Sequence, residues 1–428
     1  MWFIGINPED KLPDASLLSK FRTQRLKETT LDDIIKEVVK QCDKKGIIKG
    51  IGFSVDCTHT QANTVKKVPE RVMKHLAKKI FKNLEIELKS IPSEIDTNIP
   101  DYKKIEDHKQ AKETMKDYLN NLIENVENNV NDTPKTKNAL NEAKEILNDP
   151  KFIVQKGLRS LVDKDARVGY KSKADSFYGY KIEYAMIPEE RLITAVNVHD
   201  GAYVDGTQFR ELYNRTKECG LDIKEAYGDK AYFRKPILDL LKEEQVEAYI
   251  PVSESVYKLD ETKYSYNKDS DQWFCRMGNY TVGKKKSRKK DRESYYYYFE
   301  KEGCKSCSNQ QECLQKKLKG KMLEISVNTP AFYEYSQFTR TDGFLEKYKK
   351  RASHEWKNGE MKRFHGLDRC KGYGLRSLLT QAKLTALAVN LKRIARLVSS
   401  HYIILWYNLV ESIEPYYYLP KRLVLKPY

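Results

Sequence analysis

Four polar residues in the last quarter of the chain recur at the spacing of an α-helix: Tyr348, Arg351, Glu355 and Lys362. At about 100° per residue, their intervals place all four on one stripe of such a helix. A carboxylate in this stripe can ligate a divalent cation, while two cationic groups and a phenol hydroxyl can hold phosphate oxygens. A solvated, ion-paired helix face has a similar composition, so the spacing alone leaves both interpretations open.

Two further acids stand at the ends of expected strands and can complete a metal site. Asp56 ends a buried apolar run, and Asp229 follows a second short strand pattern. If the two strands are neighbours, both acids reach the same edge of the sheet, and Glu355 on a packed helix can close the group. Three converging carboxylates need a counter-charge, which Mg²⁺ or Mn²⁺ supplies through oxygen ligands. Glu360 competes as the third acid, but it lies about 140° from Glu355 around the helix, so we prefer Glu355.

The elements that must position these acids follow an α/β pattern. A buried strand at 51–56 precedes a polar turn at 57–64, and strand patterning returns as a hairpin at 179–187 and 191–198. The other expected elements of this core are helices at 204–218 and 236–245 and short strands at 221–227 and 248–251. Strands and helices in this order predict a mixed sheet with flanking helices.

Two segments interrupt this pattern. Residues 65–164 are rich in Lys, Glu and Asn, with sparse apolar residues at helical spacing, which indicates a helical insertion. Residues 252–335 hold a cationic run beside four consecutive tyrosines, and we interpret them as a small β-rich insertion before the helix of Glu355. A final helix follows Glu355, because Leu384, Leu387 and Leu391 keep one apolar stripe.

The second insertion carries two candidate binding features. The cysteines at 304, 307 and 313, together with Cys275, have partial zinc spacing, so a structural Zn²⁺ competes with plain reduced cysteines. The cationic run is usually a solvated loop, but beside tyrosines it is also typical of phosphate contact. The run's residues that we select as candidate DNA contacts are Lys284, Lys285, Lys286 and Arg288.

Composition limits the kind of partner. The 428 residues hold 78 Lys and Arg against 61 Asp and Glu, a formal charge of +17 that favours a polyanionic partner such as nucleic acid. No apolar run approaches the roughly 18 residues of a membrane-spanning helix, so we expect no membrane association. Eight cysteines in a chain of this length are no disulfide scaffold, and we therefore expect a reducing, cytoplasmic location.

These motifs together resemble a known family. The chain resembles DDE transposases of bacterial insertion sequences, in the subgroup whose signature Tyr-x2-Arg-x3-Glu-x6-Lys is matched in full by Tyr348, Arg351, Glu355 and Lys362. The other segments that carry the resemblance are 55–63 and 227–232 around the two aspartates, 165–167 with 179–181 before the hairpin, and 365–367 with 390–393 after the glutamate. Asn358 departs from the pattern, because we expect a bulky apolar residue one turn past Glu355.

The resemblance implies a fold, an activity and partners. The fold would be an RNase H-like mixed sheet, and Asp56, Asp229 and Glu355 would bind Mg²⁺ or Mn²⁺ for cleavage at the element's ends and attack of the freed 3′-hydroxyl on target DNA. Tyr348, Arg351 and Lys362 would contact phosphates of the double-stranded end. The protein would act as a homodimer on DNA, associated with the bacterial nucleoid. Two alternatives are a truncated, inactive DNA-binding remnant and a nuclease on the same core that cuts without joining.

The expected organisation has six parts. They are 1–50 as a helical N-terminal region, interpreted as a truncated DNA-binding domain, 51–64 with 165–251 as the first part of the catalytic core, 65–164 as the helical insertion, 252–335 as the β-rich cysteine-containing insertion, 336–400 as the C-terminal helices of the core, and 401–428 as a tail.

Overall fold

The computed structural model describes residues 30–413, except for 131–132, 154–156, 173, 290–291 and 315–319. Of the first 29 residues it describes only 9, 14, 16–20 and 24, which include the short helix α1 (Ser16–Lys20). The side chains of 400–413 and all of 414–428 lie outside the described residues, as do most of residues 1–29 in the expected N-terminal helical region and much of the expected tail.

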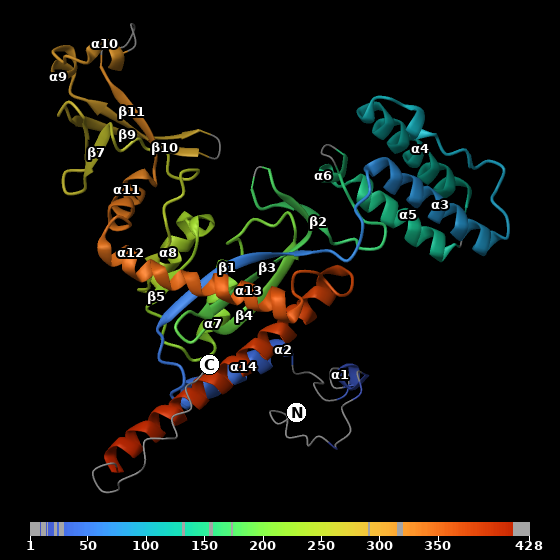
Figure 1. Cartoon of the computed structure of the whole chain (residues 1–428). Helices are drawn as coiled ribbons and strands as arrows, with labels where there is room; N and C mark the ends of the chain where they lie inside the picture. The colour runs from blue at the N-terminus through green and yellow to red at the C-terminus, as the bar shows by residue number, and fades with distance from the viewer. Residues whose placement is uncertain are drawn as a thin grey trace.

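A six-stranded mixed sheet forms the centre of the molecule (Figure 1). Its strands are β1 (Gly52–Gln61), β2 (Arg167–Tyr170), β3 (Ser176–Ile187), β4 (Leu192–Asp200), β5 (Glu225–Tyr227) and β6 (Glu247–Tyr249). The order is β2-β3-β1-β5-β6, with β4 also paired to β3. β3 runs antiparallel to β1, β2 and β4, whereas β5 runs parallel to β1 and β6. This topology is compatible with an RNase H-like fold, and the predicted hairpin is confirmed as β3 and β4.

One expectation about β1 is wrong. The strand does not end at Asp56 in a polar turn but continues to Gln61, which pairs with Gly179 of β3. The reason is that the threonines of this stretch are buried on one face of the sheet, where the Thr60 hydroxyl donates to the Leu367 carbonyl at 2.8 Å. Asp56 therefore lies within a strand rather than at its end.

Helices cover the two faces of the sheet. Phe53 and Val55 of β1 point into a core shared with α2 (Leu31–Lys44), α7 (Phe209–Lys217) and α8 (Lys235–Glu243). The opposite face, which carries Tyr180, Ile182 and Tyr184 of β3, packs against α13 (Ser353–His365) and α14 (Gly374–Ile413). Because Asp56 pairs across the strands with Tyr184, alternation along β1 places its side chain on this second face.

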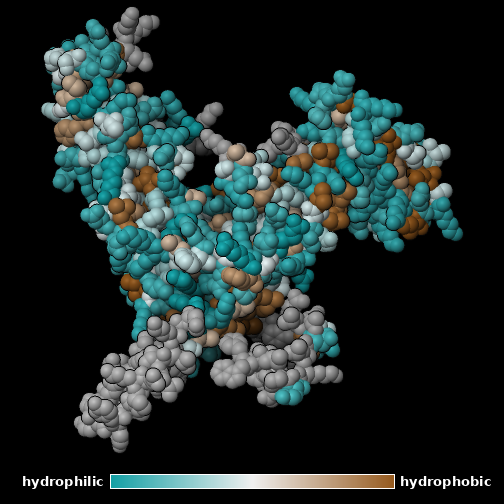
Figure 2. Space-filling view, viewed as in Figure 1, coloured by the Kyte–Doolittle hydropathy of each residue, from teal (hydrophilic) through white to brown (hydrophobic). Residues whose placement is uncertain are grey.

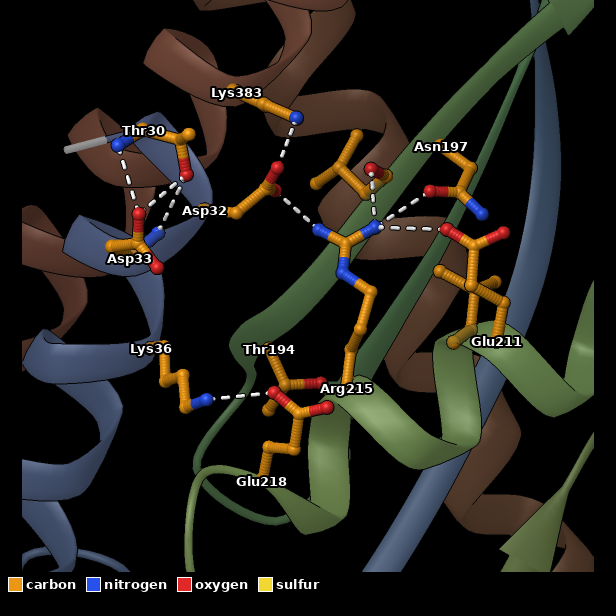
Figure 3. Close-up of polar contacts among 12 residues, drawn as sticks. Thr30, Asp32, Asp33, Lys36, Thr194, Asn197, Glu211, Arg215, Glu218 and Lys383 are labelled. Atoms are coloured by element: carbon orange, nitrogen blue, oxygen red, sulfur yellow. Dashed lines mark hydrogen bonds and ion pairs between the residues drawn. The ribbon is translucent and has the colours of Figure 1, made fainter. Parts of the chain in front are cut away.

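A buried polar network fastens α2 to the core (Figure 3). Asp32 accepts from Arg215 of α7 and from Lys383 of α14, so one carboxylate joins three helices. Arg215 also donates to the side chain of Asn197 at 2.6 Å, which reaches strand β4. A capping box between Thr30 and Asp33 begins α2 at this point, and the network therefore fixes the start of the helix.

The predicted helical insertion contains α3 (Pro69–Leu88), α4 (His108–Asn129), α5 (Pro134–Leu147), the short α6 (Pro150–Ile153) and the 3₁₀ turn η3 (Tyr102–Lys104). The three long helices enclose a core of their own and stand to one side of the sheet (Figure 1). The chain enters and leaves this bundle through one backbone bridge, with Lys67 and Arg159 exchanging both N–H···O bonds at 2.7 and 3.1 Å. The face in view is mostly hydrophilic, with apolar patches over this bundle (Figure 2).

The second insertion is β-rich, as predicted. It holds the pair β7 (Tyr264–Asn267) and β8 (Gln272–Cys275), and the three-stranded sheet β9 (Thr281–Lys289), β10 (Arg292–Phe299) and β11 (Met322–Ser326). The short helices α9 (Lys301–Lys305) and α10 (Gln310–Cys313) lie between β10 and β11, and α11 (Thr329–Phe338) leads back to the core. Trp273, Tyr297 and Phe299 form its buried centre.

The single helix that we expect from Tyr348 to Lys362 is instead three consecutive segments. They are α12 (Asp342–Tyr348), the 3₁₀ turn η5 (Lys349–Ala352) and α13. Lys347 and Lys350 flank the junction and both bind the carboxylate of Glu225 on β5. Lys347 lies in the last turn of α12 and Lys350 lies in η5, and residues three apart lie on the same side of a helix, so both lysines reach one acceptor.

The C-terminal helix α14 is longer than the predicted apolar stripe and continues past the boundary expected at residue 400. It runs beside α2 below the sheet in Figure 1. Even so, no helix in the described ranges is sufficiently long and apolar to cross a bilayer.

Candidate active site

Asp56 is the buried centre of the candidate site. Its side chain is 9% exposed, and each carboxylate oxygen has one donor: Arg351 Nη2 lies 3.3 Å from Oδ1, and Asn358 Nδ2 lies 2.9 Å from Oδ2. Burial raises the pKa of Asp56, while Arg351 and Asn358 act in the opposite direction. Without a cation, the protein therefore supplies its own counter-charge through Arg351.

Asp229 lies level with Asp56, because Ser54 of β1 pairs with Tyr227 of β5 and each acid comes two residues later. It comes two residues after β5, the parallel neighbour of β1, and caps the 3₁₀ turn η4 (Lys230–Tyr232) by accepting from the Ala231 N–H at 2.8 Å. Burial raises the pKa of Asp229, and the nearby charge of Asp56 raises it further. A buried and a half-buried acid close enough for one charge to act on the other are a suitable donor set for a hard divalent cation.

Glu355 does not join the two aspartates directly. Its side chain is 75% exposed, and its Oε1 lies 3.8 Å from Arg351 Nη1, so the guanidinium stands between Glu355 and Asp56. Among the described residues no three His, Cys, Asp or Glu side chains form a ready metal site. The competing Glu360 faces elsewhere, with Lys357 at 3.0 Å and Lys392 at 3.2 Å.

The other two signature residues lie around Asp56. Tyr348 stacks on Phe344, with ring centroids 5.8 Å apart, and burial raises its pKa, with Asp229 and Asp56 acting in the same direction. Burial lowers the pKa of Lys362, and the charge of Asp56 acts against that shift. The charge of Asp56 thus acts on three of the four signature side chains, although the helix that carries them is interrupted.

Strand β5 anchors the signature segment to the sheet. Glu225 accepts from Lys347, from Lys350 at 3.0 Å and from the Tyr227 hydroxyl. Burial opposes ionisation of Glu225, but these bonds outweigh it and lower its pKa to about 2. The Glu225 carboxylate therefore stays charged. It holds the segment that carries Arg351 at β5, the strand next to that of Asp56.

Asn358 and Tyr184 are site residues that the sequence analysis did not select. The Tyr184 hydroxyl donates to Asn358 Oδ1 at 3.0 Å, and Asn358 in turn donates to Asp56. The available signal was the polar side chain at a position where an apolar one is expected. Its partner is 302 residues away in the sequence, which no local pattern reveals.

The predicted basic run lies in the β-rich insertion, and its residues differ in their surroundings. Lys284 pairs with Asp271 at 2.7 Å and lies 3.9 Å from the centre of the Tyr295 ring, and Lys286 pairs with Glu293 at 3.0 Å. Lys285 stands opposite Tyr296 on the other face of the sheet, and Arg288 pairs in register with Glu293. All four are exposed; Lys284, Lys286 and Arg288 share one face of β9, and Lys285 lies on the other.

The four predicted zinc cysteines line one cavity of about 620 Å³ as free thiols. Asn279 Nδ2 donates to the sulfur of Cys304 at 3.0 Å, and the Asn309 N–H donates to the sulfur of Cys307 at 3.4 Å. Cys275 and Cys313 lie on the same cavity wall. Their sulfurs do not form a closed metal site in the described structure.

One comparison with known proteins gives a match to part of the chain. Residues 274–395 match the family model described as "Transposase DDE domain", which supports a DDE transposase. No curated protein and no solved structure matches the chain. The matched range contains the signature residues and most of the β-rich insertion, whereas both aspartates precede it.

Proposed function

We propose that this chain is a transposase that cleaves DNA at the ends of an insertion sequence and joins the freed 3′-hydroxyl to target DNA. One observation carries the proposal: Asp56 and Asp229 lie outside the segment that matches the transposase family, yet they meet Arg351 inside it. The fold thus brings acids from sequence that the match does not cover close to Arg351 in the matched segment.

The aspartates would hold Mg²⁺ or Mn²⁺, and Glu355 would be the third ligand. The cation would activate the attacking hydroxyl and stabilise the leaving oxygen of the phosphodiester. Arg351 would move from Asp56 to a DNA phosphate, because a guanidinium and a metal ion compete for the same carboxylate and the phosphate offers an alternative anion.

The DNA would contact two parts of the protein. Tyr348, Arg351 and Lys362 surround the acids and would bind phosphates next to the cleaved bond. The exposed lysines of β9 would bind the duplex farther away, where they add affinity without base readout. A homodimer would hold two ends for coupled joining.

The test is a strand-transfer assay with linear DNA that carries the element's own ends, with Mg²⁺ or Mn²⁺, on the wild type and on Glu355→Gln. A metal-dependent joined product that the variant does not form supports the proposal. The exposed position of Glu355 means that the variant should fold normally, which thermal unfolding checks.

Other results would replace this function. End binding without cleavage would favour an inactive DNA-binding protein, and cleavage without joining would favour a nuclease on the same core. Cleavage that persists in Glu355→Gln would mean that another carboxylate is the third ligand.

A further inference from the structure

We propose that Asn358 is a positioning residue for Asp56, holding one oxygen of the carboxylate so that the other faces the divalent cation. The inference rests on the proposed function. Its basis is a hydrogen-bonded series across the sheet and helix: the Tyr184 hydroxyl donates to Asn358 Oδ1 at 3.0 Å, and Asn358 Nδ2 donates to Asp56 Oδ2 at 2.9 Å.

The series determines the orientation of the Asn358 amide. If the amide were rotated by half a turn, its oxygen would face the Asp56 carboxylate, and two acceptors would meet without a proton between them. Tyr184 is fully buried and is the cross-strand partner of Asp56, so its hydroxyl is fixed in place by the sheet itself. The amide nitrogen must therefore point at Asp56.

Asn358 and Arg351 bind different oxygens of Asp56 and differ in charge. Arg351 at Oδ1 is a cation, so a metal ion bound to this oxygen would repel it. Asn358 at Oδ2 is neutral, so a bound cation would not repel it from the carboxylate. Each carboxylate oxygen has two lone pairs, so Asp56 can keep the amide bond and still ligate a metal. Asn358 thus serves both the metal-free and the metal-bound site.

A packing role alone does not explain an asparagine at this position. Asn is a poor residue for a helix interior, and the residues that α13 buries are Ser353, His354, Lys357 and Met361. A half-buried amide is costly unless its bonds are made, and both bonds made here lead to or from the candidate site. Hydrogen-bond donors to a metal-ligating carboxylate typically contribute about 10- to 100-fold to metal affinity or activity.

The experiment measures Mn²⁺ binding directly, by electron paramagnetic resonance of free Mn²⁺ at increasing protein, and cleavage of end DNA over a range of Mn²⁺ concentrations. In Asn358→Leu, which keeps the branching at Cγ and the number of side-chain heavy atoms but has no polar atom, we expect Mn²⁺ affinity to fall by about 10-fold or more. Cleavage should recover at high Mn²⁺, because the ligands themselves remain. Tyr184→Phe keeps the ring and removes the hydroxyl, and should weaken Mn²⁺ binding less than Asn358→Leu does.

Gly359→Ala is the matched control. It lies next to Asn358 on α13, a Cβ there meets nothing within 4 Å, and alanine favours a helix more than glycine does. Its Mn²⁺ affinity should equal that of the wild type. If Asn358→Leu folds poorly, the double variant with Gly359→Ala and the single Tyr184→Phe provide the same comparison.

Two outcomes separate failure of this inference from failure of the proposed function. Wild type that binds Mn²⁺ and cleaves DNA, with unchanged Mn²⁺ affinity in Asn358→Leu and Tyr184→Phe, overturns the positioning role alone. Wild type that neither binds Mn²⁺ nor cleaves overturns the metal-dependent function and the inference with it.

Discussion

Removing the Arg351 guanidinium should destabilise the metal-free protein and make its stability depend on divalent cations. Arg351 Nη2 lies 3.3 Å from Asp56 Oδ1, and the two side chains are 20% and 9% exposed. At an effective dielectric constant of about 20, unit charges at this distance interact by about 5 kcal/mol. Loss of one partner from a buried pair typically costs about 3–5 kcal/mol, so we expect a loss in this range for Arg351→Ala in EDTA at neutral pH.

The metal and pH dependence of that loss follow from Asp56. Mg²⁺ should restore more stability to Arg351→Ala than to the wild type, because no guanidinium competes for the carboxylate. Burial already raises the pKa of Asp56, and removal of Arg351 raises it further. A raised native pKa means that the native state binds the extra proton, so the loss should be smallest at acid pH and grow as pH rises through that pKa.

Urea unfolding with EDTA or Mg²⁺, at several pH values, measures these effects. Arg215→Ala is the control, because Arg215 is similarly buried at 21% exposure and pairs with Asp32 far from the candidate site. It should destabilise the protein without any relief from Mg²⁺. If both variants respond equally to Mg²⁺, or neither does, then Arg351 does not occupy the cation position.

Three further predictions concern other parts of the chain. Glu225→Gln should destabilise the protein at neutral pH, and urea unfolding should show the difference fading as pH falls from about 4.5 toward 2, since a lowered native pKa gives stability that acid removes. If the cysteine cavity binds zinc, elemental analysis should find about one Zn²⁺ per chain, lost in Cys307→Ser; wild type without metal would contradict the prediction. Replacing Lys286 and Arg288, which share one face of β9, by Ala should weaken binding to any duplex and lower its salt dependence by about two phosphate contacts, as measured by fluorescence anisotropy, whereas unchanged binding would exclude this face.

The sequence predicted the main acids because their placement depends on strand order. Asp56 and Asp229 follow patterns typical of buried strands, and neighbouring parallel strands bring such residues to one edge. The length of β1 was not predictable in the same way. Its polar residues resemble a turn, and only pairing with β3 and packing under the Leu367 carbonyl make them part of the sheet.

The helix around the signature shows the same limit. Spacing alone favoured one straight helix, whereas Glu225, more than 120 residues earlier, binds Lys347 and Lys350 across a 3₁₀ turn. The hydrogen bond between Asn358 and Asp56 spans 302 residues. Both features depend on contacts between distant segments. Local periodicity therefore indicates which residues matter, but it indicates less well what each of them contacts.

The bridge between Lys67 and Arg159 has a consequence for how this protein can change over evolution. The chain departs from β1 and returns toward β2 through one pair of bonded residues, reinforced by the Thr64 and Ser160 hydroxyls at 2.7 Å. This pair already holds the two ends of the core next to each other. Loss or exchange of the whole bundle therefore changes the entropy cost of closing the core's chain only a little. The bundle can therefore be shortened, or can acquire new partners, while the strand that carries Asp56 keeps its register.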